Sequence, residues 1–223
     1  MKAKACPLKS MTREMVEVVV SCYSDTVHPR AAIFHVHQAL LEAKSEWFKK
    51  ALQPQFKEGI QKRVCLTDQD PDTFEIFIQW LYTGDFAMPP STTQPLLPFH
   101  GCILGDFLQA TDFTKCCMDH LFTTFAIGSK ARAIEPKTVD WVYKSTSKGS
   151  MLRKFVALTI ATHLGSSRSA SLYDSKLGWD NELETAQEFL VDLLLAVRLS
   201  LSSLSRHHIA WEDLLKLKED QKK

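Results

Sequence analysis

The sequence lacks a long hydrophobic run. None of its apolar stretches approaches the roughly 20 residues that a membrane-spanning helix needs. Near the N-terminus the apolar run Val16 to Val20 is short and is interrupted by Glu17, so we expect no secretory signal peptide. These features argue against a membrane as a partner.

A large net charge is also missing. The 27 Lys and Arg residues are balanced by 26 Asp and Glu residues, which leaves a formal net charge of +1. Proteins that bind nucleic acid usually carry a broad basic field, so we expect no nucleic-acid partner. Hydrophobic residues make up 45% of the chain and charged residues 24%, as in ordinary globular proteins.

Motifs of common enzymes and metal sites are absent. The sequence contains no glycine-rich phosphate loop, no GxSxG elbow, no CxxC pair and no HxxxH spacing. We therefore predict that the protein is not an enzyme and needs no cofactor. The chain has six cysteines: Cys6, Cys22, Cys65, Cys102, Cys116 and Cys117. They follow no disulfide spacing, and most of them lie in apolar patterns typical of buried thiols. This usage favours a reducing compartment, the cytoplasm or the nucleus or both.

The first half of the chain mixes strand and helix patterns. Residues 15–21, 31–36 and 63–66 are predicted to be strands from their β-branched residues and alternation. From His37 onward the apolar residues follow a helical period that breaks near Ser45, a good N-cap residue. Two short helices in succession are therefore expected, the second ending at Gln53-Pro54.

The clearest helix pattern begins after Asp70. Asp70 suits the N-cap position and Pro71 the first turn, while Gly84 can provide a left-handed C-terminal stop. One face of this helix is apolar and contains Phe74, Phe77, Ile78 and Leu81.

The remainder of the chain is predicted to be helical after a proline-rich connector. Four prolines in residues 87–98 favour an extended connector there. Helices are expected within 99–110 and 112–125, and after a pause at 127–135 at 136–144, 151–164, 183–204 and 208–217.

Two groups of side chains raise the question of a metal. His35 and His37 alternate on a predicted strand and would face the same side, but one metal would need two further ligands. Cys116, Cys117 and His120 are equally explained by a buried helix face. We therefore favour structural roles. The same holds for Asp68, Asp70 and Asp72, which stand where a helix start favours negative charge.

Aromatic side chains are the remaining candidates for binding. We interpret Trp47, Phe48, Trp80 and Tyr82 as core and subunit-contact groups, since no basic residues are interleaved with them as in a nucleic-acid platform. Phe56-Lys57-Glu58 differs, because it lies in a polar stretch where an aromatic residue has no evident core partner. It is either an ordinary loop or part of a protein-binding surface.

Taken in chain order, these segments resemble a BTB/POZ domain of the type found in many stand-alone fungal proteins. The matching segments are MVEVVV, FHVHQALLEAKSEWFKKAL, FKEG, VCL, DQDPDTFEIFIQWLYTGDF and ILGDFLQATDFTKCCMDHLF. The family's signature positions are occupied by Phe34, His37, Leu41, Ser45, Phe48, Tyr82 and Gly84. The resemblance implies an α+β fold in which a cluster of short helices flanks a small mixed sheet, followed by an all-α C-terminal region.

The resemblance also implies a domain organisation. Residues 1–13 would be a disordered N-terminal segment, 14–126 the BTB/POZ domain, 127–135 a linker and 136–223 a helical region. His37 would be a scaffold histidine whose hydrogen bonds hold the junction of strand and helix, whereas His35 has no family role. Because Glu14 and Glu17 depart from the usual first strand and the preceding segment is short, a strand-exchanged dimer is less expected than dimerisation through the first helices.

The function implied by the resemblance is protein interaction. BTB domains self-associate, here as a homodimer, and many act as adaptors that bring a substrate protein to a cullin-3 ubiquitin ligase. Phe56 and Glu58 occupy the hydrophobic-x-Glu motif of such adaptors, with Phe56 as an anchor and Glu58 setting orientation. Residues 136–223 would recognise the substrate or extend the BTB domain. The alternative is a self-associating scaffold or transcription-related regulator that does not bind cullin.

Overall fold

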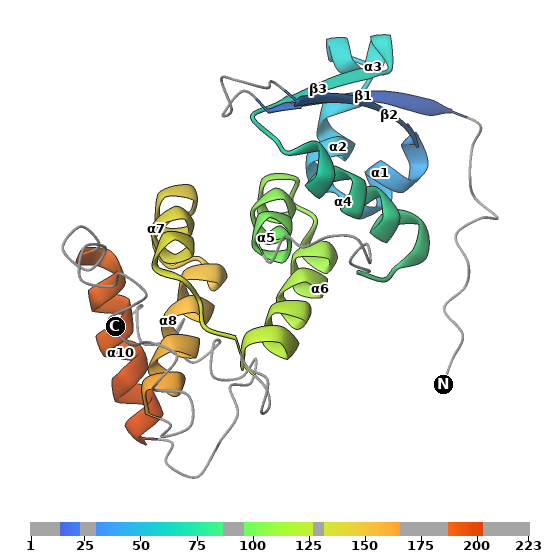
Figure 1. Cartoon of the computed structure of the whole chain (residues 1–223). Helices are drawn as coiled ribbons and strands as arrows, with labels where there is room; N and C mark the ends of the chain where they lie inside the picture. The colour runs from blue at the N-terminus through green and yellow to red at the C-terminus, as the bar shows by residue number, and fades with distance from the viewer. Residues whose placement is uncertain (1–13, 23–29, 87–95, 127–131, 166–186, 203–223) are drawn as a thin grey trace. The chain divides into compact units, whose positions relative to one another are not determined.

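The computed structural model of the chain describes residues 14–22, 30–86, 96–126, 132–165 and 187–202 (Figure 1). The expected N-terminal segment 1–13, most of the linker 127–135 and the expected helix at 208–217 lie outside or largely outside these ranges. The chain divides into two compact units, with the division between Cys117 and Met118. The expected domain boundaries near residues 126 and 136 remain predictions.

A three-stranded mixed sheet forms the first part of the N-terminal unit. Strands β1 (Met15–Cys22), β2 (Arg30–His37) and β3 (Arg63–Thr67) lie in the order β2-β1-β3. β1 pairs with β2 antiparallel and with β3 parallel. Alternate side chains of these strands are buried: Val16, Val18, Val20, Val36, Val64 and Leu66. All three predicted strands are therefore confirmed, because their β-branched residues cover one side of a half-buried sheet.

Glu17, which interrupts the valine pattern of β1, lies on the other face of the sheet. Its register neighbours are His35 on β2 and Arg63 on β3. Arg63 Nε lies 3.0 Å from Glu17 Oε1, and His35 Nε2 lies 3.8 Å from Glu17 Oε2. The carboxylate therefore stays at the surface with a cationic partner, and the strand period is preserved.

Two short helices follow β2, as predicted. α1 (Gln38–Lys44) and α2 (Glu46–Ala51) are separated by Ser45, whose backbone is extended. The Ser45 hydroxyl oxygen accepts a hydrogen bond of 3.1 Å from the Phe48 backbone N–H and so caps α2.

A further short helix was not predicted. α3 (Lys57–Gln61) begins directly after Phe56, in the segment that polarity alone would place in a loop. It ends at Lys62, whose φ of 51° is left-handed and turns the chain into β3. With five residues and little apolar content, α3 is too short for a periodic pattern to predict it.

α4 (Pro71–Thr83) has the predicted ends. Asp70 Oδ2 accepts from the Thr73 backbone N–H at 2.9 Å, and Gly84 adopts a left-handed φ of 76°. Of the four residues on the predicted apolar face, Phe74, Phe77 and Leu81 are buried and Ile78 is partly buried. α4 packs against β1, β2, α1 and α5 in the N-terminal unit.

The proline-rich connector ends earlier than predicted. α5 (Leu97–Phe107) already contains Pro98 in its first turn. Proline is tolerated there because backbone N–H groups in the first turn of a helix have no intrahelical acceptor. The preceding residues 87–95 lie outside the described ranges. α6 (Thr111–Leu121) continues into a short π-helix at Phe122–Ala126, so the helix predicted for 112–125 is present but changes its hydrogen-bond period.

The described part of the C-terminal unit is helical, as expected. It contains α7 (Pro136–Ser145), α8 (Met151–Leu164) and α10 (Gln187–Ser202), which lie beside one another in Figure 1. The buried Arg153 of α8 ties this unit together: its Nη2 donates to the Tyr143 carbonyl at 2.5 Å, and its Nη1 donates to Glu188. Among the described helices, none is both long and apolar enough to cross a membrane.

Candidate protein-interaction site

Phe56 and Glu58, the two residues of the predicted motif, stand at the start of α3. Phe56 is the N-cap residue, and 47% of its surface is exposed. Its backbone N–H donates to the Gln53 carbonyl at 3.0 Å, which fixes the chain just before the helix. Glu58 follows in the first turn and is partly exposed. The two side chains therefore stand within one helical turn, on an element with little other apolar content.

Ile60 is a further exposed apolar residue of α3 that was missed in the sequence. It is 71% exposed and lies in the same short helix as Glu58. The Ile60 backbone N–H donates to the Phe56 carbonyl at 3.1 Å. A large apolar residue in an otherwise polar segment is the signal that could have found it.

Gly59 holds this surface against α2. A Cβ atom at Gly59 would lie 2.2 Å from the Gln53 carbonyl oxygen and 2.6 Å from the Leu52 carbonyl oxygen. The close approach of the two backbones therefore requires glycine at this position. As a result, the orientation of α3, and with it that of Phe56 and Glu58, is set by the end of α2.

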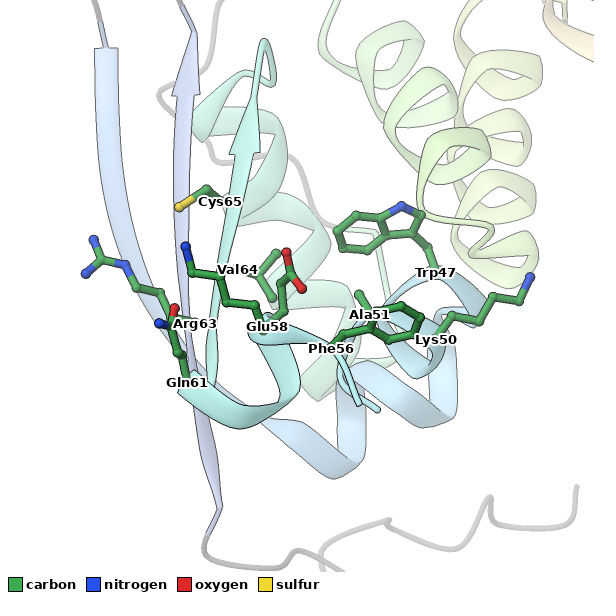
Figure 2. Close-up of a pocket in the computed structure, with 10 residues that line it drawn as sticks. Trp47, Lys50, Ala51, Phe56, Glu58, Gln61, Arg63, Val64 and Cys65 are labelled. Carbon is green, nitrogen blue, oxygen red and sulfur yellow. The ribbon is translucent and has the colours of Figure 1, made fainter. Parts of the chain in front are cut away.

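A pocket of about 750 Å³ opens beside Phe56. Figure 2 shows β3 on one side of it and Trp47, Ala51 and Phe56 on the other. Trp47 is held in place by Phe107, whose ring centroid lies 5.5 Å away. The pocket thus has an apolar wall formed by α2 and the start of α3, and it includes Trp47, which the sequence pattern had placed among core and subunit-contact groups.

The charged side chains around this pocket are mainly cationic. Lys50, Lys57 and Arg63 line it together with the single carboxylate of Glu58. Within the described part of the chain, neither Lys57 nor Glu58 forms an ion pair, whereas Arg63 is paired with Glu17. The pocket therefore combines aromatic surface with positive charge, a composition that suits a protein partner.

The predicted signature residues hold the scaffold that carries this site. Ser45 is buried, and its hydroxyl donates to the Leu108 carbonyl at 2.6 Å while it caps α2. Leu41 and Phe48 are fully buried, and the Phe34 ring lies 5.3 Å from that of Phe74. Because these groups make internal contacts, they position elements and are not aimed at a ligand. Their family roles stay a prediction.

His37 contacts the far end of α4. Its Nδ1 atom lies 2.7 Å from the Tyr82 hydroxyl oxygen, which also accepts from the His37 backbone N–H at 3.4 Å. The nearby His35 instead points to the outer face of the sheet beside Glu17. The two histidines therefore have different partners.

Among the described residues, no group of three His, Cys, Asp or Glu side chains lies close enough to hold a metal ion. Cys102 and Cys117 are buried, and burial together with a hydrogen bond that the Cys102 thiol donates to Cys117 raises the pKa of Cys102. Cys65 is exposed and is not one of the buried thiols, because its side chain falls on the outer face of β3.

Comparison with known proteins places the N-terminal half in a family. The family model described as BTB/POZ domain matches residues 9–124. Kelch-like protein 2 of Homo sapiens is 23% identical over 185 residues, which cover 74% of this chain and 30% of that protein. Kelch-like protein 23 of Mus musculus is 29% identical over 93 residues, 42% of this chain and 16% of that protein.

A third relative shows the same partial coverage. The Kelch repeat and BTB domain-containing protein 2 of Homo sapiens is 31% identical over 88 residues, 40% of this chain and 13% of that protein. The chain therefore spans less than a third of the length of these curated relatives.

Proposed function

Because the chain belongs to the BTB/POZ domain family and thus carries a protein-interaction module, we propose that it self-associates and acts as a substrate adaptor for a cullin-3 ubiquitin ligase. The partner surface is formed by Phe56 and Glu58 at the start of α3. The substrate protein is a further partner, whose identity this proposal leaves open.

The exposure of Phe56 is the observation that carries the proposal. A phenylalanine that keeps 47% of its surface in water, on a segment that also exposes Ile60, leaves apolar area that a partner can bury. Glu58 lies at the edge of this apolar surface and can orient a partner through its charge. Anchor and orienting carboxylate thus occur together, as the adaptor motif requires.

The rigidity of the surface supports the same role. Gly59 fixes α3 against the end of α2, and the Phe56 N–H is bound to the Gln53 carbonyl. An anchor that is already held in its bound position loses little conformational freedom on association. A smaller part of the free energy gained from the contacts is therefore lost to ordering the surface, and the affinity is higher.

A titration with the cullin-3 N-terminal domain tests the proposal. We expect submicromolar binding, and a loss of at least about 30-fold in Phe56→Ala and in Glu58→Lys, since anchors of this type contribute about 2 kcal/mol or more. Matched controls are Ile33→Ala, which shortens an exposed apolar side chain on the outer sheet face, and Glu75→Lys, which reverses an exposed charge on α4.

Both controls should bind like the unaltered protein. If the unaltered protein does not bind at tens of micromolar, the adaptor role is excluded and a self-associating scaffold without cullin remains. Self-association is measured separately by sedimentation, where a concentration-independent monomer would exclude the homodimer.

A further inference from the structure

β3 has a free edge in the described sheet. The order β2-β1-β3 places β3 last, so only one of its two sides pairs with a described strand. The Glu17 backbone N–H donates to the Lys62 carbonyl at 2.9 Å, and Glu17 is the register partner of Arg63. Along a strand of a parallel pair, the N–H and C=O of one residue both point to one neighbouring strand, and those of the next residue point to the opposite side. Val64 and Leu66 therefore pair with β1, while Arg63, Cys65 and Thr67 direct theirs away from it.

This free edge borders the pocket beside Phe56. Arg63, Val64 and Cys65 line the pocket from the strand side, and Trp47 and Phe56 line it from the helix side (Figure 2). Among the described residues, the outward backbone groups of Arg63 and Cys65 have no backbone partner. A fourth strand would need to lie about 4.8 Å from β3, on the side of β3 where the pocket opens.

From these observations we propose that the free edge of β3 and the adjoining pocket bind an extended, acidic segment of a partner protein, which adds to the sheet as a strand. The segment pairs its backbone with Arg63 and Cys65 and places an apolar side chain between Trp47 and Phe56. Its acidic side chains face Lys50 and Lys57. This site goes beyond cullin binding, because it depends on the strand edge and not on Glu58.

Charge selects a partner of this kind over a second copy of the chain. Of the three cationic side chains of the pocket, Arg63 is already paired with Glu17, which leaves Lys50 and Lys57 against the one carboxylate of Glu58. A symmetric pairing of two β3 edges would bring these like charges together, which is unfavourable across paired strands. An acidic segment instead gains charge-assisted contacts on the same wall.

The first test uses synthetic probes. A fluorescein-labelled octapeptide of alternating Val and Glu is titrated by fluorescence anisotropy against the full chain. Two further peptides carry backbone N-methyl groups on either the odd or the even residues, so each lacks the N–H donors of one side. We expect one methylated peptide to bind at least about tenfold more weakly and the other to bind unchanged, since strand pairing uses one side only.

The second test alters the edge of the protein. Cys65→Pro removes the outward N–H while the inner pairing through Val64 and Leu66 remains, and edge strands accept proline in this orientation. We expect at least about tenfold weaker peptide binding in Cys65→Pro, no change in Cys65→Ser, which keeps the backbone N–H, and no weakening in Glu58→Lys, which removes the one carboxylate of the pocket.

Three outcomes would overturn the proposal. These are no peptide binding up to about 1 mM, equal binding of both methylated peptides, or self-association that Cys65→Pro abolishes, which would assign the edge to a second copy. If Cys65→Pro does not fold, as judged by circular dichroism, the paired methylated peptides still decide the question. Loss of cullin binding with retained peptide binding would affect the adaptor proposal alone.

Discussion

The Nδ1 atom of His37 lies 2.7 Å from the hydroxyl oxygen of Tyr82, and this contact joins the end of β2 to the last turn of α4. The two rings also meet edge to face, with centroids 5.8 Å apart. Because Tyr82 is followed by Thr83 and the helix-ending Gly84, the contact fixes where α4 stops relative to the sheet.

Tyr82→Phe should lower the free energy of unfolding by about 1 kcal/mol, because it removes the hydroxyl that both His37 groups contact. The site is partly exposed, so water replaces some of the loss. Urea unfolding followed by circular dichroism measures the change. Gln79→Ala, at an exposed position of α4, is the control and should stay within about 0.5 kcal/mol. If the Tyr82→Phe protein is as stable as the unaltered one, the contact does not contribute to the free energy of unfolding.

Ser45→Ala should cost more, about 2 kcal/mol, because the hydroxyl is buried and makes two hydrogen bonds. The substitution uncaps α2 and takes a donor from the Leu108 carbonyl, which still accepts from the Trp47 N–H at 3.3 Å. The same urea measurement applies, with the exposed Ser145→Ala as a matched control. Equal effects of the two substitutions would contradict the capping role.

Two glycine substitutions should separate steric from conformational effects. Gly59→Ala places a Cβ against the Gln53 carbonyl, so α3 must move, and we expect a loss of about 2 kcal/mol or more together with weaker cullin binding. Gly84→Ala has open space around the new Cβ but a φ of 76°, and should cost about 1 kcal/mol without affecting binding. Unfolding and cullin titration of both proteins test this contrast, and unchanged cullin binding by Gly59→Ala would show that α3 need not be fixed.

The stability of the C-terminal unit should depend on pH through His163. Burial lowers the pKa of His163 below its ordinary 6.5, although a hydrogen bond with the Phe125 backbone acts in the opposite direction. The unfolded chain therefore takes up a proton that the folded chain resists, and the stability from the neutral imidazole is lost as the pH falls below about 6.5.

His163→Gln should reduce this loss. Between about pH 7.5 and about pH 5, the unfolding free energy of the unaltered protein should fall more steeply than that of the variant. Urea unfolding at several pH values gives both curves, and the comparison cancels the other titrating groups. Parallel curves would show that His163 does not contribute.

Local signals in the sequence were enough for most single elements. Asp70, Pro71 and Gly84 mark both ends of α4, because a cap, a first-turn proline and a left-handed stop act over a few neighbouring residues. The Ser45 break between α1 and α2 follows from the same chemistry. α3 could not be predicted, since five residues carry too little periodicity and its position depends on the close contact of Gly59 with α2.

The candidate site was predicted only in part. Phe56 and Glu58 were recognised from a motif, but nothing in their segment indicated that Trp47 and Cys65 would line the same pocket. Trp47 comes from α2 and Cys65 from β3, and they come together only through the parallel pairing of β3 with β1. Such long-range pairing leaves no local trace in the sequence.

By itself, the sequence determined the α+β character, the family, the strand and helix patterns and the motif of Phe56 and Glu58, because these depend on periodicity and short-range hydrogen bonding. The tertiary structure alone decided that β3 lies at an edge, that its outward backbone groups border a pocket, and that Glu17 sits between His35 and Arg63. These relationships arise from the packing of segments distant in the chain, which forms only when the shared core is buried.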